Sequence, residues 1–256
     1  MSAPREPILN LPAALSAYIV ALAAVHCVRV LLPPDLDLWV IEVFAFIPKR
    51  YDLSLLLEPL RGGEGAKVWT FFTYSLLHAN FAHLGVNVLW LLPFGSAVAR
   101  RFGALRFFAL MAVTAIAGAA AHLATHAHEL APMIGASASV SGAMAAAIRF
   151  AFQRGSFLSF TRGVDVDAAA YVPAVSLTRA LRNPRVLVFL AIWFGINLVF
   201  GVTSFGGAGF EGQTVAWEAH MGGFLAGLVL FSLFDPIPRA KPEAGGLAAG
   251  DRFDRG

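Results

Sequence analysis

The chain has 256 residues, of which 58% are hydrophobic and only 14% are charged, and its mean hydropathy is +0.69. This composition is too apolar for a soluble domain and predicts an all-α polytopic membrane protein. The net charge of +3 comes mainly from arginines in connections and tails, so no nucleic-acid partner is expected. The single cysteine, Cys27, excludes an intramolecular disulfide and a cysteine-based metal cage.

The first part of the chain predicts one membrane span followed by a long connection. Residues 1–10 are expected to form a short cytoplasmic N-terminus, and residues 12–32 form the first apolar run. The connection 33–68 contains two shorter apolar runs, 38–47 and 53–60. These runs are too short to cross a bilayer core of about 30 Å, so this connection is expected to be partly inserted in the membrane.

Five further spans are predicted at 82–99, 107–123, 133–152, 186–201 and 215–234. Residues 11–235 would then form one six-helix domain, followed by a disordered cytoplasmic tail, 236–256. With an N-terminus inside the cell, 14 of the 19 lysines and arginines lie on the inner side. This excess predicts that both termini are cytoplasmic.

The fourth predicted span carries three serines near its start, namely Ser137, Ser139 and Ser141. Proline is common at the first position of a helix, so this helix is predicted to begin at Pro132. Such hydroxyls can simply bond to backbone carbonyls or to a neighbouring helix. Alternatively, one of them is a nucleophile held near the positive N-terminus of the helix, where a developing negative charge is stabilised. This second interpretation needs a base at the same depth.

His220 in the sixth predicted span is the candidate base. On the predicted topology Ser137 and His220 enter from the same side and lie about 7 to 9 Å below the outer edge, at a rise of 1.5 Å per residue. An ionisable side chain at that depth indicates a functional site. Gly223 and Gly227 share a face with His220, and Gly142 lies in the fourth span. Small residues on both helices let their backbones approach closely.

His83 and Asn87 lie four residues apart at the start of the second span, so they share one helix face. Both side chains can donate a hydrogen bond without carrying a permanent charge, which suits an oxyanion hole. The alternative is that these two residues only bridge neighbouring helices.

Together, these residues resemble the rhomboid intramembrane serine proteases. The resemblance is carried by His78, His83 and Asn87 in HANFAHLGVN, by Gly135 and Gly142 around Ser137, and by Gly223 and Gly227 after His220. It implies a six-helix rhomboid-like bundle that cuts membrane-protein substrates in or near their transmembrane helices, with a Ser/His dyad and no cofactor. A bacterial inner membrane is the expected location.

The resemblance also implies roles for individual residues. Ser137 would be the nucleophile and His220 the general base. His83, Asn87 and the backbone N–H of Ser137 would hold the oxyanion, and His78 would support the start of the second span. The glycine-rich connection 202–214 would match the mobile cap of the family, and the fifth span its lateral gate.

Three positions depart from the family pattern. Ala138 replaces the usual glycine after the nucleophile, Ser141 replaces an aromatic residue that packs beneath the histidine, and Trp69-Thr70 replaces a Trp-Arg pair. Ser139 and Ser141 stay open as alternative nucleophiles. A different class of function also stays open, namely a catalytically inactive rhomboid-like protein that binds membrane clients.

Other polar residues in the apolar segments predict structural contacts. His122, His126 and His128 cluster with Glu129 at the outer end of the third span, and His122 and His126 are one turn apart, as metal ligands can be. The chain has no HExxH motif, so no metal is expected and an interfacial polar cluster is favoured. Asn197 predicts an interhelical hydrogen bond, and Glu218 is expected to point away from His220.

Overall fold

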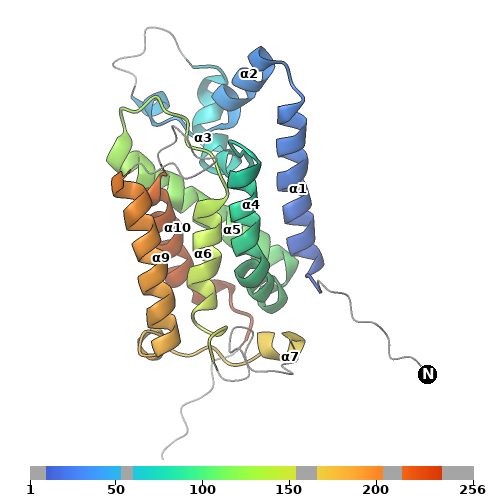
Figure 1. The fold of residues 1–256 in the computed structure, drawn as a ribbon, viewed down its shortest axis with the longest axis vertical. Helices are drawn as coiled ribbons and strands as arrows, with labels where there is room; N and C mark the ends of the chain where they lie inside the picture. The colour runs from blue at the N-terminus through green and yellow to red at the C-terminus, as the bar shows by residue number, and fades with distance from the viewer. Residues whose placement is uncertain (1–9, 53–59, 154–165, 204–214, 238–256) are drawn as a thin grey trace, which may run out of the picture.

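The structure is a computed structural model that describes residues 10–52, 60–153, 166–203 and 215–237 (Figure 1). Helices dominate these ranges, and no β-strand occurs within them beyond one isolated bridge. The predicted all-α class is therefore confirmed. Nearly all of the expected N-terminal segment and tail, and most of the expected cap, lie outside the described residues. The proposed division into 1–10, 11–235 and 236–256 thus stays a prediction.

The helices form a bundle, with α2 and α3 at one end and α7 at the other (Figure 1). Their bounds are α1 Ala13–Val30, α2 Pro34–Phe44, α3 Gly63–Thr73, α4 Phe81–Trp90, α5 Ser96–His126, α6 Ser137–Ala147, α7 Val166–Ala170, α8 Leu177–Ala180, α9 Pro184–Thr203 and α10 Trp217–Phe234. Short 3-10 helices span Pro48–Tyr51 and Tyr74–Leu76, and a π-helical turn, Leu91–Gly95, joins α4 to α5.

Three helical segments of the described chain are long and apolar enough to cross a membrane, namely Ala13–Val30, Phe81–His126 and Trp217–Phe234. The segment Pro184–Val199 is apolar but shorter. The 46 residues of Phe81–His126 do not form one straight helix, because the chain reverses at Gly103, where φ is +73°. That reversal accommodates the second and third predicted spans, while the total of six spans stays a prediction.

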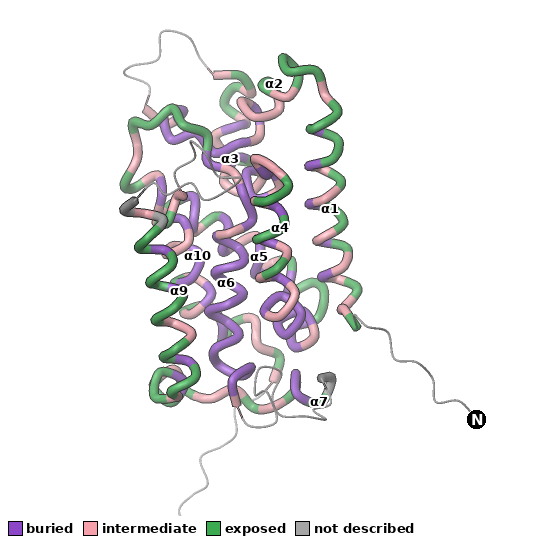
Figure 2. Tube along the Cα trace, in the orientation of Figure 1, coloured by how far each residue is buried: buried purple, intermediate pink, exposed green. Residues whose placement is uncertain are grey.

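Helix α6 lies in the middle of the bundle, and its residues from Ala138 to Ala147 are all buried (Figure 2). Glycines allow α10 to pack directly on its backbone. A Cβ atom on Gly223 would lie 2.1 Å from the carbonyl oxygen of Ala138, and one on Gly227 would lie 2.2 Å from that of Gly142. The close approach predicted for these two helices is present, and the face of α6 that faces α10 contains Ala138 and Gly142.

The start of α6 differs from the prediction. The helix begins at Ser137 rather than at Pro132, because the preceding residues are extended and paired elsewhere. The backbone of Met133 exchanges hydrogen bonds of 2.8 and 3.1 Å with Phe46, and Gly135 has a φ of +126° that few other residues adopt. The helical rise from Pro132, on which the predicted depth of Ser137 rested, is therefore wrong, and the depth itself stays a prediction.

Arg101, one of the 14 basic residues counted above on the predicted inner side, is a buried residue with structural contacts. Its guanidinium makes two contacts of 2.9 Å with the carboxylate of Asp235, just after α10. It also donates to the carbonyl oxygens of Ala170 and Val172 and lies over the ring of Phe150. A buried arginine is stable in this form because nearly every N–H group finds an acceptor. Arg101 thus fixes the end of α10 to the turn of α5.

The connection after α1 is ordered by contacts between α2 and α3. Trp69 Nε1 donates to the carbonyl oxygen of Val43 at 2.9 Å, and Thr73 Oγ1 donates to that of Phe44 at 2.7 Å. The buried guanidinium of Arg50 donates to the carbonyl oxygens of Arg61 and Glu42. These bonds hold the connection together although Thr70 replaces the arginine of the family pair.

Candidate active site

Ser137 and His220 are in direct contact, although 83 positions separate them in the sequence. Ser137 is the first residue of α6, and His220 lies in the first turn of α10. The distance from Ser137 Oγ to His220 Nε2 is 2.7 Å, which is a hydrogen bond. The packing of Gly223 and Gly227 on α6 brings these two helix starts together. A hydroxyl bonded to an imidazole is the arrangement that activates a serine.

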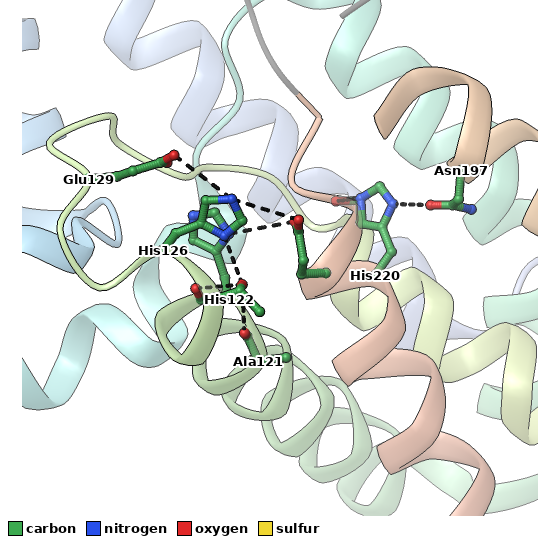
Figure 3. A network of polar contacts seen from close by, with 9 residues as sticks. Ala121, His122, His126, Glu129, Asn197 and His220 are labelled. Carbon is green, nitrogen blue, oxygen red and sulfur yellow. Dashed lines mark hydrogen bonds and ion pairs between the residues drawn. The ribbon is translucent and has the colours of Figure 1, made fainter. Parts of the chain in front are cut away.

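Asn197 of α9 forms a hydrogen bond with Nδ1, the other ring nitrogen of His220 (Figure 3). Its Oδ1 lies 2.6 Å from His220 Nδ1, and its Nδ2 donates to the carbonyl oxygen of Trp193 at 2.8 Å. Because the amide nitrogen already faces an acceptor, the amide oxygen must face the histidine. His220 Nδ1 therefore carries the proton, and Nε2 is free to accept the hydroxyl proton of Ser137. The interhelical hydrogen bond predicted for Asn197 is confirmed.

The position of Ser137 at the helix start exposes backbone donors. The first backbone hydrogen bond within α6 runs from Val140 N to the carbonyl oxygen of Ala136, at 2.9 Å. The N–H groups of residues 137–139 precede this bond, so they have no acceptor within the helix. The helix dipole adds a partial positive charge at the same point.

His83 and Asn87 lie on the same cavity wall as Ser137. The ring of His83 packs against the backbone of Gly135, where an added Cβ would lie 2.7 Å from Cε1 and Nε2 of the ring. Only glycine therefore lets His83 approach the chain next to Ser137. Asn87 Nδ2 donates to the carbonyl oxygen of His83 at 3.0 Å, which uses one of its two amide hydrogens. The two predicted oxyanion residues are thus brought together with Ser137.

His78 lies behind His83, just before α4. Its side chain is fully buried, its ring centroid is 5.2 Å from that of His83, and its carbonyl oxygen accepts from Arg29 at 2.8 Å. Neither ring nitrogen has a hydrogen-bond partner among the described residues. Burial, reinforced by the neighbouring His83, lowers the pKa of His78 to about 3. The ring is therefore neutral at pH 7.

This neutral histidine predicts a loss of stability in acid. The unfolded chain takes up a proton at an ordinary histidine pKa of about 6.5, whereas the folded chain does not until well below pH 5. The free energy of unfolding should therefore fall as pH drops below 6.5, by up to about 1.4 kcal/mol per pH unit for this one group. Thermal unfolding in detergent between pH 7.5 and 5 should show a smaller pH dependence for His78→Gln than for the wild type. Equal slopes would contradict the prediction.

The two alternative serines have other partners. Ser139 is fully buried and its Oγ donates to the carbonyl oxygen of Met111 at 2.8 Å. The Oγ of Ser141 donates to the carbonyl oxygen of Ser137 at 2.7 Å. Both are backbone bonds of the kind that serines make in apolar helices. Only Ser137 faces the imidazole.

The Ser–His pair opens into a cavity of about 620 Å³. Its polar wall carries His83, Asn87, Asn197, Ser137 and His220. The rest is mostly apolar and comes from helices on two sides, with Trp90 and Val86 of α4, Met144 of α6, and Trp193 and Ile196 of α9. A cavity of this size and character can hold a short stretch of peptide with an apolar side chain.

The sequence predicts a cluster of His122, His126 and His128 with Glu129, and the structure arranges the acidic and histidine residues near the site differently. Glu218 points away from His220, as predicted, and its carboxylate lies near His122 and His126. His128 does not join them, because its Nδ1 contacts the carboxylate of Asp52 at 2.6 Å. The described residues therefore contain one group that could hold a metal ion, namely His122, His126 and Glu218. The sequence did not indicate that Glu218 belongs to this group.

Comparison with known proteins supports a family assignment. Residues 65–235 match the Rhomboid domain, which covers about two thirds of the chain. A comparison with curated proteins gave no significant match. The matched region contains most of α3 and all of α4 to α10, and therefore Ser137, His220 and every polar residue of the cavity wall named above. The chain is an integral membrane protein that belongs to the rhomboid family.

Proposed function

We propose that this protein is an intramembrane serine endopeptidase, with Ser137 as nucleophile and His220 as general base. The observation that carries the proposal is the 2.7 Å contact between Ser137 Oγ and His220 Nε2. A hydroxyl oriented on the unprotonated nitrogen of a fixed imidazole can lose its proton as it attacks a carbonyl carbon. Members of the family are typically intramembrane serine proteases, which agrees with this chemistry.

The reaction would proceed in two halves. Ser137 Oγ attacks the scissile carbonyl while His220 Nε2 takes its proton, and the same imidazolium then protonates the leaving amine. Water, deprotonated by His220, next hydrolyses the acyl-enzyme and releases Ser137. The backbone N–H of Ser137 and the side chains of His83 and Asn87 would stabilise the oxyanion in both halves.

Substrates would be transmembrane proteins. The cavity is bounded by α4 and α9, whose outer faces carry exposed apolar side chains such as Leu89 and Leu198. An apolar segment could therefore reach Ser137 from the lipid between these two helices, with α9 acting as the lateral gate. A helix with small or helix-breaking residues would expose its backbone most easily. The inner membrane of a bacterium stays the predicted location.

Two assays on the wild-type protein test the proposal. Detergent-purified protein should be labelled by a fluorophosphonate, which phosphonylates an activated serine with loss of fluoride. The same protein in lipid vesicles should cleave a single-span model substrate within or next to its span. Absence of both signals, in protein shown to be folded by thermal unfolding, would instead favour the client-binding alternative.

Asn197 is expected to be a positioning residue for His220. Asn197→Ala removes the acceptor of the Nδ1 proton, so the imidazole can rotate or adopt the wrong tautomer. We expect kcat to fall by about tenfold or more, the equivalent of one hydrogen bond of about 1.4 kcal/mol, with KM little changed. Asn197→Asp keeps an oxygen acceptor and should recover part of the rate.

A matched control for Asn197 lies at the other end of α9. The amide of Asn183 donates to the carbonyl oxygen of Phe152 at 3.3 Å and has no contact with His220. Asn183→Ala should therefore change the unfolding temperature without a selective loss of kcat. If Asn197→Ala and Asn183→Ala affect kcat equally, the positioning role is wrong.

A further inference from the structure

A second polar cluster lies beside the catalytic cavity. It is formed by His122 and His126 at the end of α5 (Figure 3) and by Glu218 in the first turn of α10. We call it the α5–α10 cluster. The two histidines are one helical turn apart, and their rings are stacked with centroids 4.6 Å apart. Glu218 approaches both rings from the neighbouring helix. Three potential ligands from two helices thus converge on one point.

The ligand atoms of this cluster lie within 4.8 Å of one another, too far apart for the hydrogen bonds of a closed network and near enough for one bridging ion. His122 Nδ1 lies 3.9 Å from Glu218 Oε2, and His126 Nε2 lies 3.7 Å from Glu218 Oε1. Direct imidazole–carboxylate contact elsewhere in the chain is much closer, as His128 and Asp52 show at 2.6 Å. Ligands bound tetrahedrally to zinc at about 2.0 to 2.1 Å lie about 3.3 Å from one another. A small inward shift would complete such a site.

Burial and hydrogen bonding favour a cation at this cluster. The side chain of His122 is only 7% exposed, and its Nδ1 is buried with no hydrogen-bond partner among the described residues. Glu218, also largely buried at 14% exposure, places a carboxylate next to this nitrogen. A buried acceptor and a buried carboxylate are both stabilised by a shared cation.

The second histidine has the supporting contact that metal ligands usually have. His126 Nδ1 lies 2.7 Å from the hydroxyl of Thr125, which orients the ring so that Nε2 faces the carboxylates. The carboxylate of Glu129 lies 3.8 Å from the same Nε2 and is 47% exposed. Glu129 or water can therefore occupy a fourth coordination position.

We propose that His122, His126 and Glu218 bind one divalent transition-metal ion, with zinc as the preferred ion. Two imidazoles and a carboxylate match the ligands that zinc takes, whereas calcium and magnesium prefer sites made of oxygen atoms alone. The ion joins α5 to the first turn of α10, two residues before His220. The ion would also lie at the wall of the catalytic cavity, because His122 and Glu129 both line that cavity. The proposal does not depend on the proposed protease activity.

Zinc binding to the full-length protein in detergent tests the proposal directly. Protein stripped with EDTA should bind one zinc per chain in competition with a chromophoric chelator, and zinc should raise its unfolding temperature by several degrees. Magnesium at millimolar concentration should have no such effect. Failure of the wild type to compete for zinc, or an equal shift with magnesium, would overturn the site.

Single substitutions distinguish this site from incidental binding. Glu218→Gln keeps the size of the side chain, and His126→Gln changes a partly exposed residue, so both variants should fold. Each should weaken zinc binding at least tenfold and lose the thermal shift. His128→Gln removes a histidine of the same region that contacts Asp52 instead, and it should bind zinc like the wild type. An equal loss in His128→Gln, or no loss in the two site variants, would show that the assignment is wrong.

Discussion

Ser137→Ala is expected to abolish both fluorophosphonate labelling and substrate cleavage. Without the hydroxyl no acyl-enzyme forms, and loss of the nucleophile in serine proteases lowers kcat by about 10⁶-fold. His220→Ala should have a comparable effect, because an unactivated serine reacts slowly, and the double variant should be no worse than either single one. Labelling intensity and the rate of cleavage in vesicles measure both effects.

The neighbouring serines provide matched controls for this prediction. Ser141→Ala removes a hydroxyl that only bonds to the carbonyl oxygen of Ser137, so labelling should persist. Ser139→Ala removes the bond to Met111 and should lower stability by about 1 kcal/mol while leaving the reactive serine in place. Labelling that survives in Ser137→Ala but disappears in either control would move the nucleophile to that residue.

Gly223→Ala is expected to move His220 on α10 away from Ser137 on α6. The new Cβ would lie 2.1 Å from the carbonyl oxygen of Ala138, so α10 must move away from α6. Overpacking of this kind lowers stability by about 1 to 3 kcal/mol. His220 lies one turn earlier on the same helix, and a displacement near 1 Å can lower the rate by about 100-fold. Thermal unfolding and cleavage rate should therefore both decrease.

A glycine in open surroundings controls for the change of residue type. Gly85 is exposed on α4, and no atom lies within 4 Å of the position of its Cβ. Gly85→Ala should leave activity unchanged and raise helix stability by up to about 1 kcal/mol. If Gly223→Ala retained full activity while staying folded, the close contact between α6 and α10 would not be what positions His220.

The sequence was sufficient to predict that the chain is helical and which polar residues mostly meet at the cavity. The length of the apolar runs predicted the spans, whose total of six stays a prediction, and small residues at regular spacing indicated that the fourth and sixth would pack closely. Ser137, His220, His83 and Asn87 were identified because polar groups are rare in such segments and need partners. These signals are local, so a single sequence can carry them.

Other features depend on contacts between distant segments and were missed. Pro132 is a typical helix start, but pairing of Met133 with Phe46 keeps the chain extended up to Ser137. Asn197 was expected to bond between helices, yet nothing local indicated that its partner is His220. Glu218 was only expected to point away from His220, and its position next to the histidines of α5 follows from how α5 and α10 cross.

The bridge between Phe46 and Met133 has a consequence for where the protein can be shortened. The match to the family begins at residue 65, so α1, α2 and Phe46 lie upstream of it. Nevertheless, Phe46 forms backbone hydrogen bonds with Met133, four residues before Ser137, and these bonds hold that part of the chain in place. A fragment trimmed to the matched region would retain every polar residue of the cavity wall but would lose these hydrogen bonds. Phe46 therefore supports the chain next to the start of α6 although it lies outside the matched region.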